Sequence, residues 1–113
     1  MAVQLILSKE ARRSIDEQLI SYEENDDQGG IELADRWLNR LQDALDDLCT
    51  NPMRHGFAPE NGRWRPEVLI RQMRFRPWKG RPGWRVLYTV TEDRLMMLQL
   101  RHQKQRLLDD DDS

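Results

Sequence analysis

Residues 84–102 read WRVLYTVTEDRLMMLQLRH, and this stretch decides the fold. Residues 84–91 are rich in β-branched and aromatic side chains that alternate in character along the chain, which is typical of a half-buried strand. Glu92 and Asp93 then predict a turn, and the nearly continuous apolar run 95–100 predicts a central strand that is covered on most of its length. The two strands together predict a hairpin.

The two faces of this hairpin differ in character, so we expect one face to be packed against a core and the other to be polar. Alternation places every second side chain of the first strand on the packed face, namely Trp84, Val86, Tyr88 and Val90. The second strand is expected to place Met96, Leu98 and Leu100 on one face and Leu95, Met97 and Gln99 on the other. The polar face is expected to carry Arg85, Thr89, Gln99 and Arg101.

The chain before the hairpin predicts a strand, two helices and a further strand. Residues 2–7 are apolar and predict the first strand. Over residues 9–24 the spacing of apolar side chains changes to three and four residues, which predicts a helix. Ser8 directly precedes this segment and is predicted to be its N-cap. A second amphipathic stripe predicts a helix that ends near Thr50, before an Asn-Pro pair, and residues 68–75 alternate as a strand does.

These elements predict an α+β fold. An N-terminal strand is followed by a two-helix antiparallel hairpin and then by a three-stranded antiparallel sheet packed on the helices. We expect the other face of the sheet to be free, residues 53–66 to form an irregular crossing loop, and the basic loop RPWKGRPG at 76–83 to contact a ligand. Residues 1–108 are predicted to be a single domain, and residues 109–113 to be a disordered acidic tail.

Composition excludes several classes of protein. A chain of 113 residues is long enough to bury a core without disulfides, and the lone Cys49 lies at helical spacing among leucines, which predicts a core position. No segment approaches the roughly 20 apolar residues of a membrane span. The short apolar run at 3–7 is soon followed by basic residues, unlike a signal peptide, so we expect a cytoplasmic protein with no membrane partner.

Charge is distributed unevenly along the chain. Residues 1–62 hold six Lys/Arg and 13 Asp/Glu. Residues 63–108 hold 12 Lys/Arg and three Asp/Glu, and this segment therefore carries a net charge of +9. Three tryptophans are interleaved with these basic residues, a combination that is compatible with phosphate and base contacts. The alternative is that the arginines and tryptophans pack and pair with the acidic half.

The candidate functional residues belong to the polar face of the predicted sheet. Guanidinium groups on three adjacent strands would bind phosphates and stabilise a developing negative charge. His102 lies just beyond the second strand and is the one side chain of this group that exchanges protons near neutral pH. A single histidine after a strand is, however, more often an ordinary polar residue or a structural hydrogen-bonder. No zinc spacing, glycine-rich phosphate loop or nucleophile elbow occurs, so we expect no metal and no cofactor. The group consists of Gln72, Arg74, Arg85, Gln99, Arg101, His102 and Lys104.

The pattern resembles the RelE/ParE superfamily of bacterial type II toxins over nearly the whole chain. The most telling stretches are the helix end LDDLCTNP at 45–52 and the segment GWRVLYTVTEDRLMMLQLRHQK at 83–104. The resemblance implies a small cytoplasmic toxin without a metal, neutralised by a cognate antitoxin that wraps it. Charge asymmetry adds the expectation that this antitoxin is partly acidic and folds on binding.

Two activities are compatible with the resemblance. RelE-like members cleave mRNA on the ribosome with basic strand residues and commonly a C-terminal tyrosine, whereas ParE-like members poison DNA gyrase without chemistry of their own. No aromatic residue follows His102, so a nuclease here would need His102 as its acid or base. A non-toxic protein that only binds a partner is the third possibility. The implied catalytic set is Arg74, Arg85, Arg101 and His102, and the implied RNA- or target-binding set is Arg71, Gln72, Trp78, Lys79, Arg81, Gln99 and Lys104.

Overall fold

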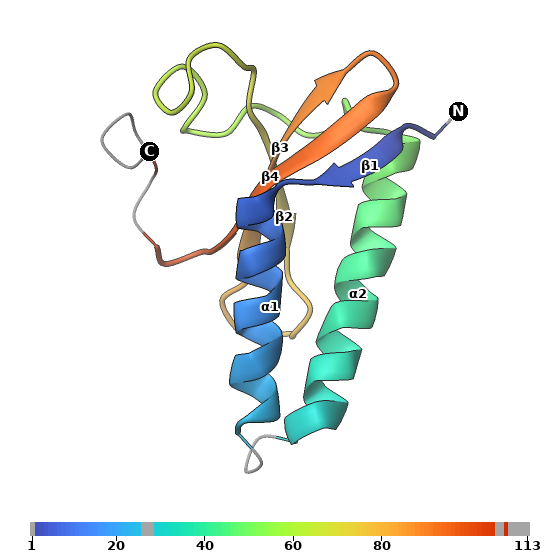
Figure 1. Cartoon of the computed structure of the whole chain (residues 1–113), viewed down its shortest axis with the longest axis vertical. Helices are drawn as coiled ribbons and strands as arrows, with labels where there is room; N and C mark the ends of the chain where they lie inside the picture. Colours follow the sequence, from blue (N-terminus) through green and yellow to red (C-terminus); the bar gives the residue numbers. More distant parts are fainter. Residues whose placement is uncertain (1, 26–28, 106–107, 109–113) are drawn as a thin grey trace.

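The computed structural model describes residues 2–25, 29–105 and 108, and the predicted acidic tail at 109–113 lies outside them. Two helices, α1 (Lys9–Glu23) and α2 (Gly30–Thr50), form the predicted antiparallel hairpin (Figure 1). Ser8 caps α1 as predicted, because its Oγ accepts a hydrogen bond from the backbone N–H of Ala11 at 3.0 Å. The helix pair agrees with the sequence in type and number, and the predicted helix ends near Glu24 and Thr50 lie within one residue of the observed ends.

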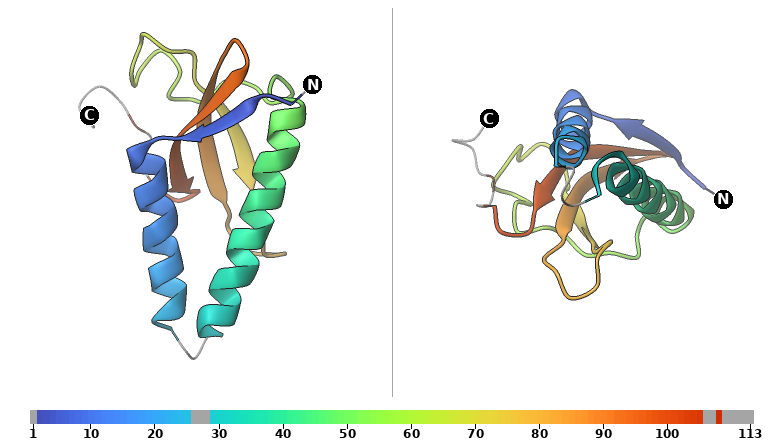
Figure 2. Two further views of the ribbon diagram at one scale, coloured as in Figure 1. Left: turned by 45° about the vertical axis from the view of Figure 1, so that its right-hand side comes forward. Right: turned by 90° about the horizontal axis from the view of Figure 1, so that it is seen from below.

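The sheet has four strands in the order β1-β4-β3-β2, with bounds β1 (Gln4–Leu7), β2 (Arg71–Phe75), β3 (Trp84–Thr91) and β4 (Arg94–His102). The last three strands are antiparallel as predicted, and the two-residue turn between Thr91 and Arg94 closes the expected hairpin. The first strand adds to β4 in parallel, which makes the sheet mixed (Figure 2). The α+β class is confirmed, and the partner of β1 is new information.

The helices cover one face of the sheet and build the main core with it. Trp37 of α2 is fully buried and packs edge-on against Phe75 and Trp84, at 5.8 and 5.6 Å between ring centroids. Cys49 is buried in this core as predicted, and burial, followed by the charge of Asp46, raises the pKa of its thiol. The strand residues of this core are Met73, Phe75, Trp84, Val86, Tyr88, Leu95, Met97 and Leu100.

The opposite face is not free, so that prediction is wrong. Residues 51–70 form neither helix nor strand, yet they fold over this face and build a second hydrophobic cluster. The loop is tied to β2 by backbone hydrogen bonds, including the one from Gln72 N–H to the Gly56 carbonyl at 3.1 Å. Irregular backbone can cover a sheet in this way because its own polar groups are paired. The members of the second cluster are Ala58, Trp64, Ile70, Leu87, Leu98 and Leu108.

A β-bulge in β4 reverses the faces that simple alternation predicts. Leu87 of β3 pairs with Gln99, but Tyr88 pairs with Met97, so Leu98 is the extra residue. Leu98 therefore belongs to the second cluster, whereas Leu100 belongs to the helix-side core. The predicted grouping of Leu98 with Leu100 is wrong because one inserted residue shifts the period of two.

Within the part of the chain that the structure describes, no helix combines the length and the apolar character needed to cross a membrane.

Candidate functional site

The register of the sheet brings the three predicted arginines into one cross-strand row. Arg74 of β2 lies opposite Arg85 of β3, and Arg85 lies opposite Arg101 of β4. The flanking row places Gln72 and Gln99 on either side of Leu87. Side chains in one such row project from the same face, so sequence alternation correctly grouped these residues.

The centre of the row does not present a free charge, however. Arg85 is only 6% exposed, and its two terminal nitrogens donate to both carboxylate oxygens of Glu60 at 2.8 and 2.7 Å. Glu60, on the covering loop, is fully buried and also accepts a hydrogen bond from the Leu108 N–H at 3.3 Å. The expectation of three exposed guanidinium groups is therefore wrong at Arg85, because the loop supplies a carboxylate that neutralises it.

The pKa of Glu60 reflects this pairing. Burial alone raises the pKa of the carboxyl, but the hydrogen bonds and the positive charge of Arg85 outweigh it, so the net pKa of Glu60 is lower than its ordinary value. The pair is thus held in its ionised form. Gln72 adds a further acceptor, 3.1 Å from the guanidinium of Arg85. Such a fully hydrogen-bonded pair fixes the loop onto the sheet.

The other predicted residues of this face remain at or near the surface. Arg74 and Lys104 are exposed, and Arg101 is half-buried with a hydrogen bond to Gln99 at 3.3 Å. Arg71 is engaged elsewhere: it donates to the His55 carbonyl at 2.6 Å and lies over a phenylalanine ring. The predicted set is therefore split between the exposed Arg74 and Lys104 and three arginines with protein partners, namely Arg71, Arg85 and Arg101.

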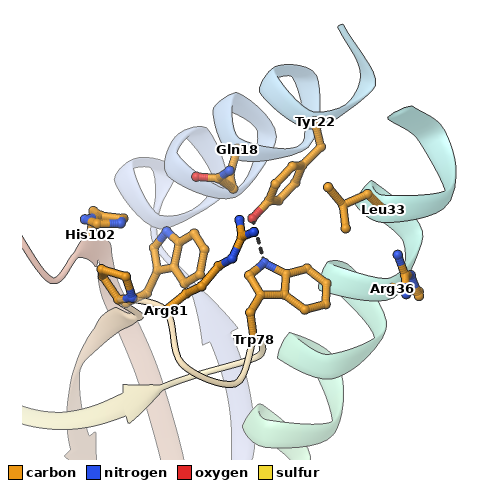
Figure 3. A pocket seen from close by; sticks show the side chains of 9 residues that line it. Gln18, Tyr22, Leu33, Arg36, Trp78, Arg81 and His102 are labelled. Atoms are coloured by element: carbon orange, nitrogen blue, oxygen red, sulfur yellow. Dashed lines mark hydrogen bonds between the residues drawn. The ribbon is translucent and has the colours of Figure 1, made fainter. Parts of the chain in front are cut away.

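A second feature, which we call the groove, lies between the helix hairpin and the β2–β3 loop (Figure 3). Its larger cavity has a volume of about 700 Å³. A smaller cavity of about 280 Å³ shares Gln18, Trp84 and His102 with it. The larger cavity is lined by Gln18 and Tyr22 of α1, Leu33 and Arg36 of α2, Trp78, Arg81 and Pro82 of the β2–β3 loop, and Trp84 and His102 of the sheet.

The β2–β3 loop is anchored to the helices through Trp78. The indole N–H of Trp78 donates to the Tyr22 hydroxyl at 3.1 Å, and the guanidinium of Arg40 lies 5.1 Å from the ring centroid. Arg40 also donates to the Pro77 carbonyl. The loop ends at Gly83, where a Cβ would collide with the backbone of Phe75, so the chain needs glycine there. Two predicted contact residues, Trp78 and Arg81, thereby lie in the cavity beside the helices, whereas Lys79 of the same loop is exposed and does not line it.

His102 lies at the end of β4 and lines both cavities. Its ring packs edge-on against Trp84 at 5.4 Å, and its Nδ1 accepts a hydrogen bond from the Lys104 N–H at 3.2 Å. In the neutral ring Nδ1 is thus the acceptor, which places the remaining proton on Nε2. His102 is therefore directed into the groove region and is separate from the buried pair.

Sequence reasoning missed Glu60, Gln18 and Tyr22. Glu60 is 25 residues from Arg85 along the chain and lies in a loop without periodicity, so no local pattern connects the two. Gln18 and Tyr22 are four residues apart on α1 and thus share one helix face, which was a detectable signal. No group of His, Cys, Asp and Glu suited to a metal occurs among the described residues.

Comparisons with known proteins place this fold in a family. A family model described as the ParE toxin of the type II toxin-antitoxin system parDE matches residues 5–107. A solved structure described as the chromosomal ParDE TA system from P. aeruginosa matches with a TM-score of 0.60 and 13% identity, over 89% of this chain and 96% of that chain, which shows a shared fold. No curated protein sequence matches. Because the family model spans most of its length, the chain belongs to the ParE toxin family within the RelE/ParE superfamily.

Proposed function

We propose that this protein is a type II toxin that arrests growth by binding DNA gyrase rather than by cleaving mRNA. The observation that carries the proposal is the burial of Arg85 in its ion pair with Glu60. An arginine that stabilises charge on a reacting phosphate must reach that phosphate with its donors. The donors of Arg85 are already directed at a carboxylate and a glutamine.

Energetics support the same conclusion. Withdrawing Arg85 from Glu60 would leave a buried carboxylate without its partner, which costs about 3–5 kcal/mol. A substrate would have to supply that energy before catalysis began. Binding to a protein target makes no such demand, since the exposed residues of the surface suffice.

A second candidate, the ribosome-dependent mRNA endonuclease, has one observation in its favour. Arg101 and His102 both line the smaller cavity, although Arg101 belongs to the arginine row on the loop side and His102 pairs with Trp84 in the adjacent row on the helix side. For this activity, Arg101 would bind the phosphate and His102 would take the proton from the 2′-hydroxyl as its oxygen bonds to phosphorus; the bond from phosphorus to the 5′-oxygen would break, and that oxygen would take up a proton from water. The Arg85–Glu60 pair would then serve only to hold the sheet and the loop together.

The partner implied for the free toxin is an antitoxin with an acidic segment. Residues 63–108 carry +9, and Arg74, Arg76, Lys79 and Arg81 are exposed. An acidic amphipathic segment that folds on this surface would neutralise the charge and block the target. Binding of this kind weakens as salt rises, so the complex should dissociate more readily at high ionic strength.

The decisive experiment induces the full chain in bacteria without its antitoxin. Message 5′ ends are mapped while the DNA damage response is recorded, and purified protein is added to a gyrase supercoiling assay. We expect intact messages, an induced damage response and inhibited gyrase. Discrete new 5′ ends within translated frames, without a damage response, would replace the gyrase proposal with the endonuclease. Absence of growth arrest in a folded, expressed chain would leave only a partner-binding role.

A matched pair of variants sharpens this test. The double substitution Glu60→Leu with Arg85→Met removes both buried charges together and fills the same space, which should preserve the fold. We expect this variant to keep its toxicity, because neither side chain contacts the target in our proposal. Lost toxicity in a folded double variant that still binds antitoxin would contradict it. Arg74→Gln is the control on the same face, since Arg74 is exposed and its loss does not disturb a buried pair.

A further inference from the structure

The larger cavity of the groove is cationic. Arg36 and Arg81 contribute two guanidinium groups, and no carboxylate occurs among the described residues that line it. Arg36 lies 5.8 Å from the ring centroid of Trp78, so its charge is held next to an aromatic wall. Figure 3 shows the side chain of Arg81 extending toward Trp78 and Tyr22, inside the same hollow. The lining therefore favours an anionic ligand.

The aromatic walls of this cavity are fixed in place. Trp84 is 7% exposed and contacts three rings, those of Trp37, Phe75 and His102, at centroid distances of 5.6, 6.0 and 5.4 Å. Trp78, on the loop side, is half-buried and is oriented by its hydrogen bond to the Tyr22 hydroxyl. Because Trp84 is almost fully covered by these rings, Trp78 is the tryptophan of the cavity that a planar ligand can reach, and a rigid aromatic surface binds such a ligand without first having to be ordered.

Directional polar groups complete the site. Gln18 offers both an amide donor and an acceptor from α1. His102 offers its Nε2 proton, because Nδ1 is occupied by the Lys104 N–H. Both residues also line the smaller cavity, whose lining includes Arg101 and the carboxylate of Glu17. The larger cavity thus combines an aromatic wall, hydrogen-bonding groups and two cations.

We propose that the groove binds a free nucleoside phosphate, with the base against Trp78 and the phosphate on Arg81 and Arg36. A cavity of about 700 Å³ is large enough for such a ligand, since small-molecule sites typically measure about 300–1,000 Å³. Base stacking on aromatic side chains and bidentate arginine–phosphate pairing are the two strongest contacts that this lining can offer. An acidic peptide would use the same cations but would not need fixed aromatic walls.

The test of this site is independent of the proposed toxin target. None of its residues belongs to the Arg85–Glu60 pair, and binding is measured on the isolated chain in the absence of gyrase or ribosomes. Failure of nucleotide binding would therefore leave the gyrase proposal untouched, and failure of gyrase inhibition would leave the nucleotide site untouched.

The test titrates the purified full chain with ADP, GDP, CDP and UDP, and follows binding by tryptophan fluorescence and by calorimetry. We expect saturable one-to-one binding of at least one of them, weaker binding of the matching nucleoside, and competition by inorganic phosphate. Arg81→Gln should weaken binding about tenfold or more, because it removes a charge-assisted contact to the phosphate. Arg81 is exposed, so this variant is expected to fold.

Lys79→Gln is the matched control. Lys79 is on the same loop, is exposed and carries the same charge, but it does not line the cavity. We expect its affinity for the nucleotide to equal that of the original chain, whereas Trp78→Leu, which shortens one wall, should reduce affinity. Equal losses in the Lys79 and Arg81 variants would mean non-specific attraction and overturn the proposal. The proposal also fails if none of the four nucleotides saturates, or if only oligonucleotides bind.

Discussion

Both faces of the sheet are buried, but the segments that cover them differ: helices cover one face and an irregular loop covers the other. The helix side is covered by two regular, amphipathic helices, whose apolar side chains, Trp37 of α2 among them, pack on the sheet. The opposite side is covered by residues 51–70, which have no regular structure, and by Leu108. The helix side is held together by ring packing, whereas the loop side adds a buried ion pair between Glu60 and Arg85.

This difference shows how a face of a sheet can be buried either by regular helices or by an irregular loop. Helices satisfy their own backbone hydrogen bonds, so only side-chain packing is needed to hold them on the sheet. The loop must satisfy its polar groups individually, as when the Asn61 side chain accepts from the Ile70 N–H at 2.9 Å. A cover made from many separate contacts is expected to open locally at lower cost than a helix pair.

The largest expected effect compares two fully buried tryptophans, one from each face. Trp37→Ala should lower the free energy of unfolding by about 3–5 kcal/mol, because it empties the centre of the helix-side core. Trp64→Ala should cost less, since the irregular loop around it can relax into the space. Urea unfolding of both variants measures the difference. An equal or larger loss for Trp64→Ala would show that the loop is as rigid as the helices.

The next effect concerns the ion pair on the loop side. Arg85→Met alone should lower the free energy of unfolding by about 3 kcal/mol, because it leaves the carboxylate of Glu60 buried without its partner. Adding Glu60→Leu should restore most of that loss. A double-mutant cycle in urea isolates the coupling between the two residues. If the two single losses simply add in the double variant, the pair does not stabilise the loop as a unit.

The smallest effect is the dependence of stability on pH that Glu60 contributes on the loop side. The pKa of Glu60 in the folded protein is below its ordinary value of 4.5, so ionised Glu60 stabilises the fold above that value. As the pH falls below 4.5, the unfolded chain takes up the proton first and this stabilisation decreases. The chain should therefore lose more stability than the Glu60→Leu, Arg85→Met double variant as the pH is lowered through and below this value. Parallel pH profiles for the two proteins would contradict this assignment.

Much of the fold could be predicted from the sequence because the signals were local. The helix bounds, the Ser8 cap and the β3–β4 hairpin each depend on residues within a few positions of one another. The prediction of side-chain faces from alternation was wrong at Leu98, because a single bulged residue in β4 changes the face that the following side chains of the strand occupy. The grouping of Arg74, Arg85 and Arg101 was correct in register, but their chemical environment was not predicted.

The sequence by itself determined the family, the order of the elements and which side chains share the arginine row, since periodicity and hairpin register depend on near neighbours. Only the tertiary structure decided that Arg85 is neutralised by Glu60, and that residues from α1, α2, the β2–β3 loop and β4 enclose the groove. These contacts join residues far apart in the chain. Their existence depends on how the loop crosses the sheet and how the helices pack, which no local pattern encodes.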